Sequence, residues 1–275
     1  MAHLEAQIYQ SSLECVINVA EGRSGATLES LASSVGPALI DLHRDPDHHR
    51  SVFTLAGSTL GQATRDLAMR TIELVDIHTH HGVHPRLGAL DVVPFAPLAG
   101  GSLAGAIAAR DSFARWAADE LGLPCFLYGP EATLPDIRRN AFRTLRPDFG
   151  PAIPHPSAGA TCVGARPALV AYNLWLAEPD IARARGVANR IRHSELRVLA
   201  MKMGDQVQVS CNLVAPDLFG PAQAYDAVAT LAPIARAELV GLIPASTLAA
   251  IPRSRWAQLD LSQDRTIEVR LARTG

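Results

Sequence analysis

The same order of short and long apolar segments occurs twice along the chain, once on each side of a proline-rich stretch. Apolar residues alternate with polar ones in the short segments, which favours β-strands. In the longer segments they recur every three to four residues, which favours amphipathic α-helices. Each half loosely follows the order strand, helix, strand, strand, helix, strand. This order predicts two α+β subdomains, because each sheet needs helices to cover its apolar face.

The predicted elements follow from this periodicity. In the first half, strands are expected at residues 13–20, 38–42, 51–56, 90–95 and 125–128. Helices are expected there at residues 27–35, 58–75 and 102–121. In the second half, strands are expected at residues 168–176, 196–203, 206–213 and 238–244, with helices at 180–192 and 222–235. The Gly204-Asp205 step between two of these strands predicts a hairpin.

A proline-rich loop at residues 147–159 separates the two halves. It contains neither Lys nor Arg, and no helix or strand periodicity is visible in it. A long loop without regular structure inside a compact chain is usually functional or a linker. We therefore place the subdomains at residues 1–165 and 166–275, with this loop at their junction.

Charge and composition exclude several classes of protein. The chain has 25 Lys+Arg against 27 Asp+Glu, which is too balanced for broad binding to nucleic acid or anionic membranes. No signal peptide is evident, and the uncharged stretch at residues 92–109 is broken by Pro and Gly residues. The four cysteines have no CxxC spacing, so reduced buried thiols are expected. These features predict a cytoplasmic protein whose partners are small molecules.

Histidine is the residue type that most suggests chemistry in this chain. Seven of the ten histidines lie between His43 and His84, and an imidazole is the usual general acid–base near neutral pH. His78 and His81 have a spacing that could ligate a metal, but no HExxH-like arrangement surrounds them, so we expect no metal. A helix end explains the His78–His81 cluster without any chemistry. For His84 the residues alone leave a catalytic and a structural role open.

A second polar loop, at residues 41–50, lies between two predicted strands. Its Asp-Pro-Asp sequence is typical of a solvated turn. Alternatively, Arg50 or Asp41 faces the same cleft as His84, and spacing does not decide between these interpretations. Nucleophilic catalysis finds little support, because the sequence contains no GxSxG motif and no cysteine beside a histidine.

Seven short motifs, in order, resemble those of one enzyme family. They are ECVINVAEGR at residues 14–23, DPDHHRSVFT at 45–54, GVHPRLGALDVVPF at 82–95, DFGP through GAT at 148–161, VGAR with AYN at 163–173, QVSCNL at 208–213 and ELVGLIP at 238–244. Together they resemble the glutamate formimidoyltransferases (formiminotransferases), a unit that also forms the amino-terminal part of formiminotransferase–cyclodeaminase. Because the chain ends at Gly275, no cyclodeaminase portion is expected in it.

The resemblance implies a fold, an activity and a site. The fold would be α+β, with two ferredoxin-like-type subdomains whose β-sheets face each other across a folate-binding groove. The activity would be transfer of the formimino group of N-formimino-L-glutamate to N5 of tetrahydrofolate in histidine degradation, with His84 as the acid–base and no metal. Tetrahydrofolate would be a co-substrate, and a homodimer is possible in the family. The folate-binding residues would be Gly150, Pro151, Ala152, Ile153, Pro154, His155, Pro156, Ser157, Ala158 and Gly159.

This chemistry suggests roles for four further residues. Attack on the amidine carbon requires that one nitrogen lose a proton and another gain one, and one imidazole can serve both steps. Asp41 and Asp91 are candidates to stabilise the cationic amidine. Arg50 and Arg86 are candidates to bind the carboxylates of the substrates, although ion pairs with nearby Asp residues explain both equally well.

Two departures from the family pattern bear on the substrate. Val83 stands where the family often has Glu, and Ala158 stands where some relatives have Trp. Formyl transfer between 5-formyltetrahydrofolate and glutamate, or the use of another amino acid such as glycine, is therefore an alternative activity. A non-catalytic folate-binding relative is a third possibility.

Overall fold

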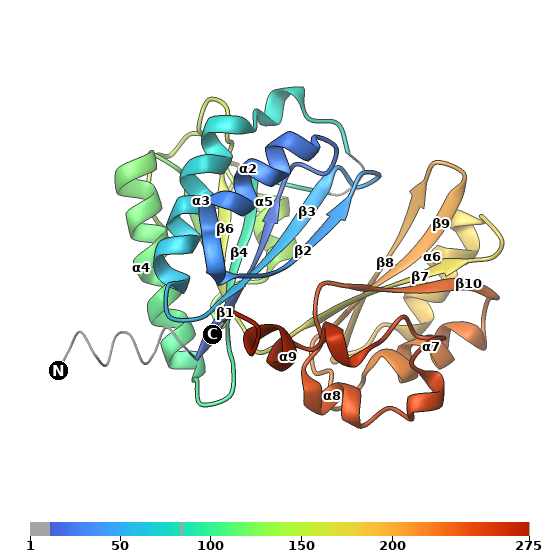
Figure 1. Cartoon of the computed structure of the whole chain (residues 1–275). Helices are drawn as coiled ribbons and strands as arrows, with labels where there is room; N and C mark the ends of the chain where they lie inside the picture. The colour runs from blue at the N-terminus through green and yellow to red at the C-terminus, as the bar shows by residue number, and fades with distance from the viewer. Residues whose placement is uncertain (1–11, 83–84, 275) are drawn as a thin grey trace. The chain divides into compact units, whose positions relative to one another are not determined.

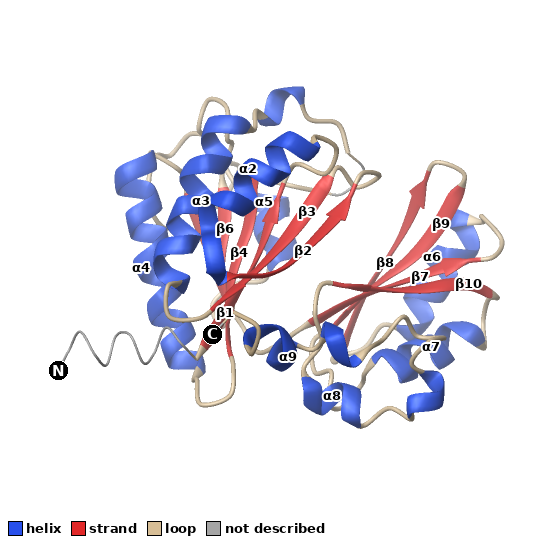
Figure 2. Ribbon diagram, viewed as in Figure 1, coloured by secondary structure: helices blue, strands red, loops and turns tan. Residues whose placement is uncertain are grey.

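The computed structural model describes residues 12–82 and 85–274 of the chain. Its contacts divide the chain into two compact units, which meet between Arg166 and Pro167. Figures 1 and 2 show that both units combine one β-sheet with several helices. The predicted α+β class is therefore confirmed, and each unit is described by itself below. The expectation that the two sheets face each other stays a prediction.

The first unit contains a six-stranded sheet of order β2-β3-β1-β4-β6-β5. Its strands are β1 (Leu13–Val19), β2 (Leu39–Asp45), β3 (Arg50–Ala56), β4 (Leu90–Pro97), β5 (Cys125–Tyr128) and β6 (Thr161–Ala165). Its helices are α2 (Gly25–Val35), α3 (Leu60–Leu74), α4 (Leu103–Leu121) and α5 (Leu134–Asn140). Strands β2, β3, β1 and β4 pair antiparallel, whereas β6 pairs parallel with β4 and β5.

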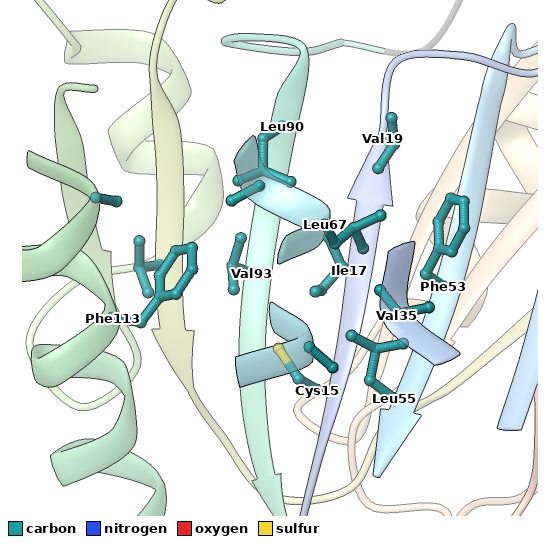
Figure 3. Packing of buried hydrophobic residues seen from close by; sticks show 14 of the residues in the cluster. Cys15, Ile17, Val19, Val35, Phe53, Leu55, Leu67, Leu90, Val93 and Phe113 are labelled. Carbon is teal, nitrogen blue, oxygen red and sulfur yellow. The ribbon is translucent and has the colours of Figure 1, made fainter. Parts of the chain in front are cut away.

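One face of this sheet packs on α2, α3 and α4 and forms the core of the first unit (Figure 3). Cys15, Ile17 and Val19 of β1 belong to this core, as do Phe53 and Leu55 of β3. Successive side chains of a strand point to opposite faces of a sheet. The residues between these core positions therefore lie on the other face.

The other face of the same sheet is polar over β1 and β3. Glu14 and Asn18 of β1 lie on it and are buried, and the Arg50 guanidinium on β3 donates to Asn18 Oδ1. Over β5 and β6 the face is apolar, and α5 covers it by packing Ile137 against a cluster that includes Phe126. The sheet thus has an apolar face under the three long helices and a partly polar face that only α5 covers among the described helices of this unit.

Local signals in the sequence set the limits of the helices. Ser24 and Ser102 cap α2 and α4, because the hydroxyl of each accepts a hydrogen bond from a backbone N–H of the first turn. Helix α4 ends at Gly122, whose φ of 59° lies in the left-handed region that favours glycine. Contacts within a few residues therefore define the start of both helices and the end of α4.

The second unit has a four-stranded antiparallel sheet of order β10-β7-β9-β8. Its strands are β7 (Val170–Leu176), β8 (Leu196–Met203), β9 (Gln206–Leu213) and β10 (Ile234–Val240). Its helices are α6 (Ile181–Ile191), α7 (Pro221–Ala229), α8 (Ala245–Ala249) and α9 (Ile267–Leu271). If its strands are numbered one to four along the chain, their spatial order across the sheet is four, one, three, two. The strands β4-β1-β3-β2 of the first unit follow the same order, so the predicted internal similarity extends to the topology.

Several sequence predictions need correction. The helix expected at residues 222–235 ends at Ala229, because the chain turns there and β10 already begins at Ile234. The proline-rich loop at residues 147–159 does not form the junction of the units, since β6 of the first unit follows it. Strand β6 and helix α5 were not predicted, because both are too short to show a period. No described helix is long and apolar enough to cross a membrane.

Candidate functional site

Three segments meet at the C-terminal end of β1: the turn after this strand, the β2–β3 turn, and the segment that leads into β4. The Ala20 N–H donates to the carbonyl of Ala89 at 2.7 Å. Gly22 lies so close to the β2–β3 turn that an added Cβ would be 2.2 Å from the carbonyl oxygen of Asp45. Backbone contacts therefore bring together three of the motifs that the sequence singled out.

A cluster of histidines occupies this meeting point. The rings of His49 and His80 stack with centroids 3.9 Å apart and an interplanar angle of 16°. His49 Nε2 lies 3.2 Å from Glu21 Oε1, and its Nδ1 lies 3.3 Å from the carbonyl oxygen of His81. Burial, together with the positive charge of Arg86, lowers the pKa of His80 to about 4, so this ring is neutral at physiological pH. The cluster thus combines a neutral imidazole with a carboxylate-bound one.

Arg86 is tied to this cluster and to the β2–β3 turn. Its guanidinium contacts the ring of His80, and its NH2 group donates to the carbonyl of His48 at 3.3 Å. Burial lowers the pKa of Arg86, whereas the charge of Asp91 acts in the opposite direction. Arg86 therefore has a structural role in the cluster, in addition to any role toward a substrate.

Arg50 lies on the polar face of the sheet beside Asn18. Its Nε donates to Asn18 Oδ1 at 3.1 Å. Burial lowers the pKa of Arg50 to about 10, a value at which the guanidinium still keeps its charge at neutral pH. The charges of Asp91 and Arg138 also act on Arg50, in opposite directions, which places all three groups in one electrostatic neighbourhood.

Asp91 is the carboxylate of this neighbourhood, and Arg138 is its ion-pair partner. Asp91 Oδ1 accepts from the Leu87 N–H at 2.8 Å, and Oδ2 lies 2.6 Å from the NH2 group of Arg138. The Asp91 side chain is buried, with only 4% of its surface exposed. Asp91 therefore holds the segment before β4 and balances part of the arginine charge.

The sequence analysis missed Arg138 and the helix that carries it. Thr133 caps α5 by accepting from the Asp136 N–H, and Pro135 occupies the first turn. A Thr followed three residues later by Asp, with Pro between them, is a helix-start signature. That signature would have identified α5, but nothing in the sequence indicates that its Arg138 reaches Asp91.

The proline-rich loop is bonded directly to the segment that follows residue 84. The Ala89 N–H donates to the carbonyl of Ala158 at 2.9 Å, and the Ala160 N–H donates to the carbonyl of Leu87 at 3.1 Å. Gly88 and Gly159 form an isolated antiparallel bridge between the two segments. Two segments that the resemblance implicated separately, one in folate binding and one in catalysis, therefore lie side by side.

The proline-rich loop is closed on itself around His155. His155 Nδ1 accepts hydrogen bonds from the N–H groups of Ser157 and Ala158 at 3.3 and 3.1 Å. The backbone of His155 also exchanges two hydrogen bonds with Gly159. Residues 150–154, in the middle of the loop, are exposed, whereas Ala158 and Gly159 are buried. The loop is anchored at both ends, because Phe149 exchanges backbone hydrogen bonds with Cys125 and Ala158 accepts one from Ala89, and its exposed middle is open to a ligand.

The structure brings three of the predicted site residues together. Arg50, Arg86 and Asp91 come together near the end of the proline-rich loop that carries Ala158 and Gly159. Asp41 lies on β2 and pairs with Thr54 of β3, about 13 Å along the strand from the end of β2. His84 and Val83 lie outside the described residues.

His78 lies outside this cluster of histidines. His78 is exposed and pairs with Asp76 at 3.0 Å. Among the residues that the structure describes, no three His, Cys, Asp or Glu side chains are grouped to hold a metal ion.

The second unit has its own polar group on the side of its sheet away from α6 and α7. Glu238 Oε2 accepts from the indole N–H of Trp175 at 2.9 Å and from the amide of Asn173 at 3.2 Å. The Arg236 guanidinium lies 4.1 Å from the centroid of the Trp175 ring. The sequence analysis did not identify these residues, although an alternating strand with Asn and Trp on one face is a usable signal.

Comparison with known proteins identifies similar chains. The family model described as "Formiminotransferase domain, N-terminal subdomain" matches residues 12–166. A glutamate formimidoyltransferase of Streptococcus pyogenes serotype M1 is 33% identical over 272 residues, covering 86% of this chain and 90% of that protein. A glutamate formimidoyltransferase of Thermoplasma acidophilum is 30% identical over 274 residues, with the same coverage of both chains.

A longer relative matches over the same part of this chain. The formimidoyltransferase-cyclodeaminase of Sus scrofa is 30% identical over 274 residues, which cover 86% of this chain. The match covers 51% of the porcine protein, so this chain corresponds to about half of that relative.

Proposed function

The chain belongs to the formiminotransferase family, and from this premise we propose that it transfers the formimino group of N-formimino-L-glutamate to N5 of tetrahydrofolate. The chain is accordingly an enzyme of the transferase class. The two compact units would be the amino- and carboxy-terminal formiminotransferase subdomains. Four free, buried cysteines suit a reducing compartment such as the cytoplasm.

One observation carries this proposal more than any other. The proline-rich loop is hydrogen-bonded to the backbone on the carboxyl side of His84, through Leu87 and Ala89. A folate held by the exposed residues 150–154 would therefore lie near the predicted catalytic segment. This adjacency is what a transfer between two bound molecules requires, because the reacting atoms must be brought within about 3–3.5 Å of each other.

The charges of the site suit anionic substrates. Arg50, Arg86 and Arg138 share one buried carboxylate neighbour, Asp91. Guanidinium groups recognise carboxylates with two parallel hydrogen bonds, and both the glutamate donor and the folate tail carry carboxylates. We propose that Arg50 and Arg86 contribute to binding them. Asp91 would act through Leu87 and Arg138 and would not contact the amidine itself.

His84 would move the protons of the reaction. N5 of tetrahydrofolate attacks the amidine carbon and forms a tetrahedral intermediate. The imidazole accepts the N5 proton and then donates a proton to the departing glutamate nitrogen, so that the carbon–nitrogen bond breaks and glutamate leaves neutral at nitrogen. General acid–base catalysis of this kind typically contributes about 10²–10⁴-fold to the rate.

Steady-state kinetics with a His84→Ala variant test this function. The wild-type enzyme is expected to convert N-formimino-L-glutamate and tetrahydrofolate with a change in the folate spectrum, and His84→Ala is expected to lose about 10²-fold or more in kcat while still binding folate. The same assay with 5-formyltetrahydrofolate and glutamate, or with N-formiminoglycine, shows whether another donor is preferred. Wild-type protein that binds folate but turns over none of these donors would contradict the proposed activity.

A further inference from the structure

We propose that Glu21 and His49 form a clasp that positions the catalytic segment, with His49 acting as an imidazolium between two fixed acceptors. The inference rests on the proposed function, because it gives these residues a role in the turnover of that site. They are positioning residues: none of the contacts described below reaches a substrate. Both were left without a role by the family resemblance.

The first step concerns the two ring nitrogens of His49. Nε2 faces the carboxylate of Glu21 at 3.2 Å, and Nδ1 faces the carbonyl oxygen of His81 at 3.3 Å. Both of these partners can only accept a hydrogen bond. A neutral imidazole has a single N–H, so only the doubly protonated ring donates to both partners at once.

The second step concerns Glu21, which is fixed in place as an anion. Its Oε1 accepts from the backbone N–H groups of Arg23 and Ser24 at 2.6 and 2.9 Å, just before α2 begins. Burial raises the pKa of Glu21, but these two N–H groups and His49 outweigh it and hold the pKa below its usual value. The carboxylate is therefore charged at neutral pH and is held by two backbone hydrogen bonds.

The third step concerns His80, on which His49 stacks. His80 Nε2 lies 2.7 Å from the carbonyl oxygen of His49, a partner that can only accept a hydrogen bond. The guanidinium of Arg86 contacts both ring nitrogens of His80, and this positive charge, together with burial, keeps the ring neutral. A neutral ring can lie against an imidazolium without charge repulsion, so the stack is compatible with a protonated His49.

The fourth step concerns the backbone of His49, which has a positive φ. Its φ is 49°, in the left-handed region that residues other than glycine seldom adopt, although histidine is enriched there together with Asn and Asp. The turn also approaches Gly82 closely, since an added Cβ on Gly82 would lie 2.4 Å from the carbonyl oxygen of His48. Strained residues of this kind persist where surrounding contacts hold them, and they concentrate at functional sites.

Together these contacts hold His80, His81 and Arg86 against the β2–β3 turn. On the amino side, His80 and His81 bond to His49. On the carboxyl side, the Arg86 NH2 group donates to the carbonyl of His48. Among the described residues, the charged and titratable groups whose contacts carry this argument are Glu21 and the neutral His80 on His49 itself and Arg86 on His80. Loss of the His49 contacts would let the segment shift, and a displacement of about 1 Å can cost about 10²-fold in rate.

Two variants and a matched control test the clasp by kinetics. Glu21→Gln keeps an oxygen that can accept from the Arg23 and Ser24 N–H groups but removes the charge that favours the imidazolium. His49→Phe keeps a stacking ring but removes both hydrogen bonds. Both are expected to lower kcat by about 10- to 100-fold while KM for either substrate changes less than about threefold. His78→Asn, in the same segment but exposed and outside the clasp, is expected to retain wild-type kcat.

A spectroscopic measurement tests the clasp independently of activity. The ¹⁵N chemical shifts of the His49 ring at pH 7 are expected to show two protonated nitrogens in the wild type and a neutral ring in Glu21→Gln. A neutral His49 in folded wild-type protein would overturn the proposal, and so would an unchanged kcat in folded Glu21→Gln protein. A wild-type enzyme without turnover but with an imidazolium at His49 would instead refute the proposed function and leave the clasp geometry standing.

Discussion

Gly88 and Gly159 pair across two segments that are remote in sequence, and neither position has room for a side chain. A Cβ on Gly88 would lie 2.2 Å from the carbonyl oxygen of Ala158, and one on Gly159 would lie 2.4 Å from the carbonyl oxygen of Leu87. We expect Gly88→Ala to force the proline-rich loop away from the catalytic segment. The expected cost is about 1–3 kcal/mol in the free energy of unfolding, measured by urea denaturation, with a larger proportional loss of kcat.

Gly186→Ala is the matched control for this change. Gly186 is exposed within α6, and an added Cβ would meet nothing within 4 Å. Ala is the better helix former by about 1 kcal/mol, so the control is expected to stabilise the protein slightly. Equal stability of Gly88→Ala and the wild type would show that the two segments are not held together as the structure indicates.

The regular part of the fold could be predicted because its elements obey simple periods. Strands β8 and β9 begin and end where the alternation and the Gly204-Asp205 turn placed them. Helix α4 has a serine cap and a left-handed glycine at its two ends, and both are visible in the sequence. Strand β6 could not be found in this way, because five residues that include a glycine show no period and owe their conformation to the neighbours β4 and β5.

Asp91 is a buried carboxylate near three arginines, so replacing it is expected to destabilise the protein more than replacing one of those arginines. Asp91 pairs with Arg138 and also favours the charged forms of Arg50 and Arg86. Asp91→Asn leaves all three guanidinium groups without this carboxylate, whereas Arg138→Met leaves Asp91 with two cationic neighbours. We therefore expect Asp91→Asn to cost about 3–5 kcal/mol and Arg138→Met to cost less.

A double-mutant cycle with both changes measures the Asp91–Arg138 coupling. Because the two groups are in direct contact, the coupling is expected to exceed about 1 kcal/mol. Arg139→Ala is the control, since Arg139 is the next residue on α5 and its pair with Asp136 is exposed. Such surface pairs contribute about 0–1 kcal/mol. A larger cost for Arg138→Met than for Asp91→Asn would contradict the shared-carboxylate arrangement.

Individual residues of the candidate site could be predicted from the sequence, but the contacts between them could not. The chemistry implied by the resemblance pointed to Arg50, Arg86 and Asp91, and the fold brings these three together. Asp41 was an equal candidate to Asp91 in the sequence, and the structure places it on β2, paired with Thr54 of β3. The contact of Glu21 with His49 joins the turn after β1 to the β2–β3 turn. No local sequence pattern indicates that these two turns are in contact.

The exposed middle of the proline-rich loop, residues 150–154, offers a test that separates binding from folding. Ile153 is 71% exposed, so replacing it removes little packing. If residues 150–154 contact the folate, Ile153→Asp should raise KM or Kd for tetrahydrofolate about 10-fold by placing a charge against an apolar or anionic part of the ligand. Its free energy of unfolding should stay within about 0.5 kcal/mol of the wild type. An unchanged folate affinity, measured by titration calorimetry, would argue that the ligand lies elsewhere.

The neutral His80 ring makes the stability of the protein depend on pH in a predictable direction. Burial, with Arg86 nearby, lowers the pKa of His80 from the ordinary 6.5 to about 4 in the folded chain. Between these two pH values the unfolded chain binds more protons than the folded chain. The contribution of His80 to the free energy of unfolding is therefore complete above pH 6.5 and is lost as the pH falls toward 4. We compare wild type with His80→Gln, which cannot titrate. From pH 7.5 to 4.5 the wild type should lose on the order of 1 kcal/mol more, a value reduced for partial solvent screening. Parallel pH profiles of the two free energies of unfolding would mean that His80 is not held neutral by its surroundings.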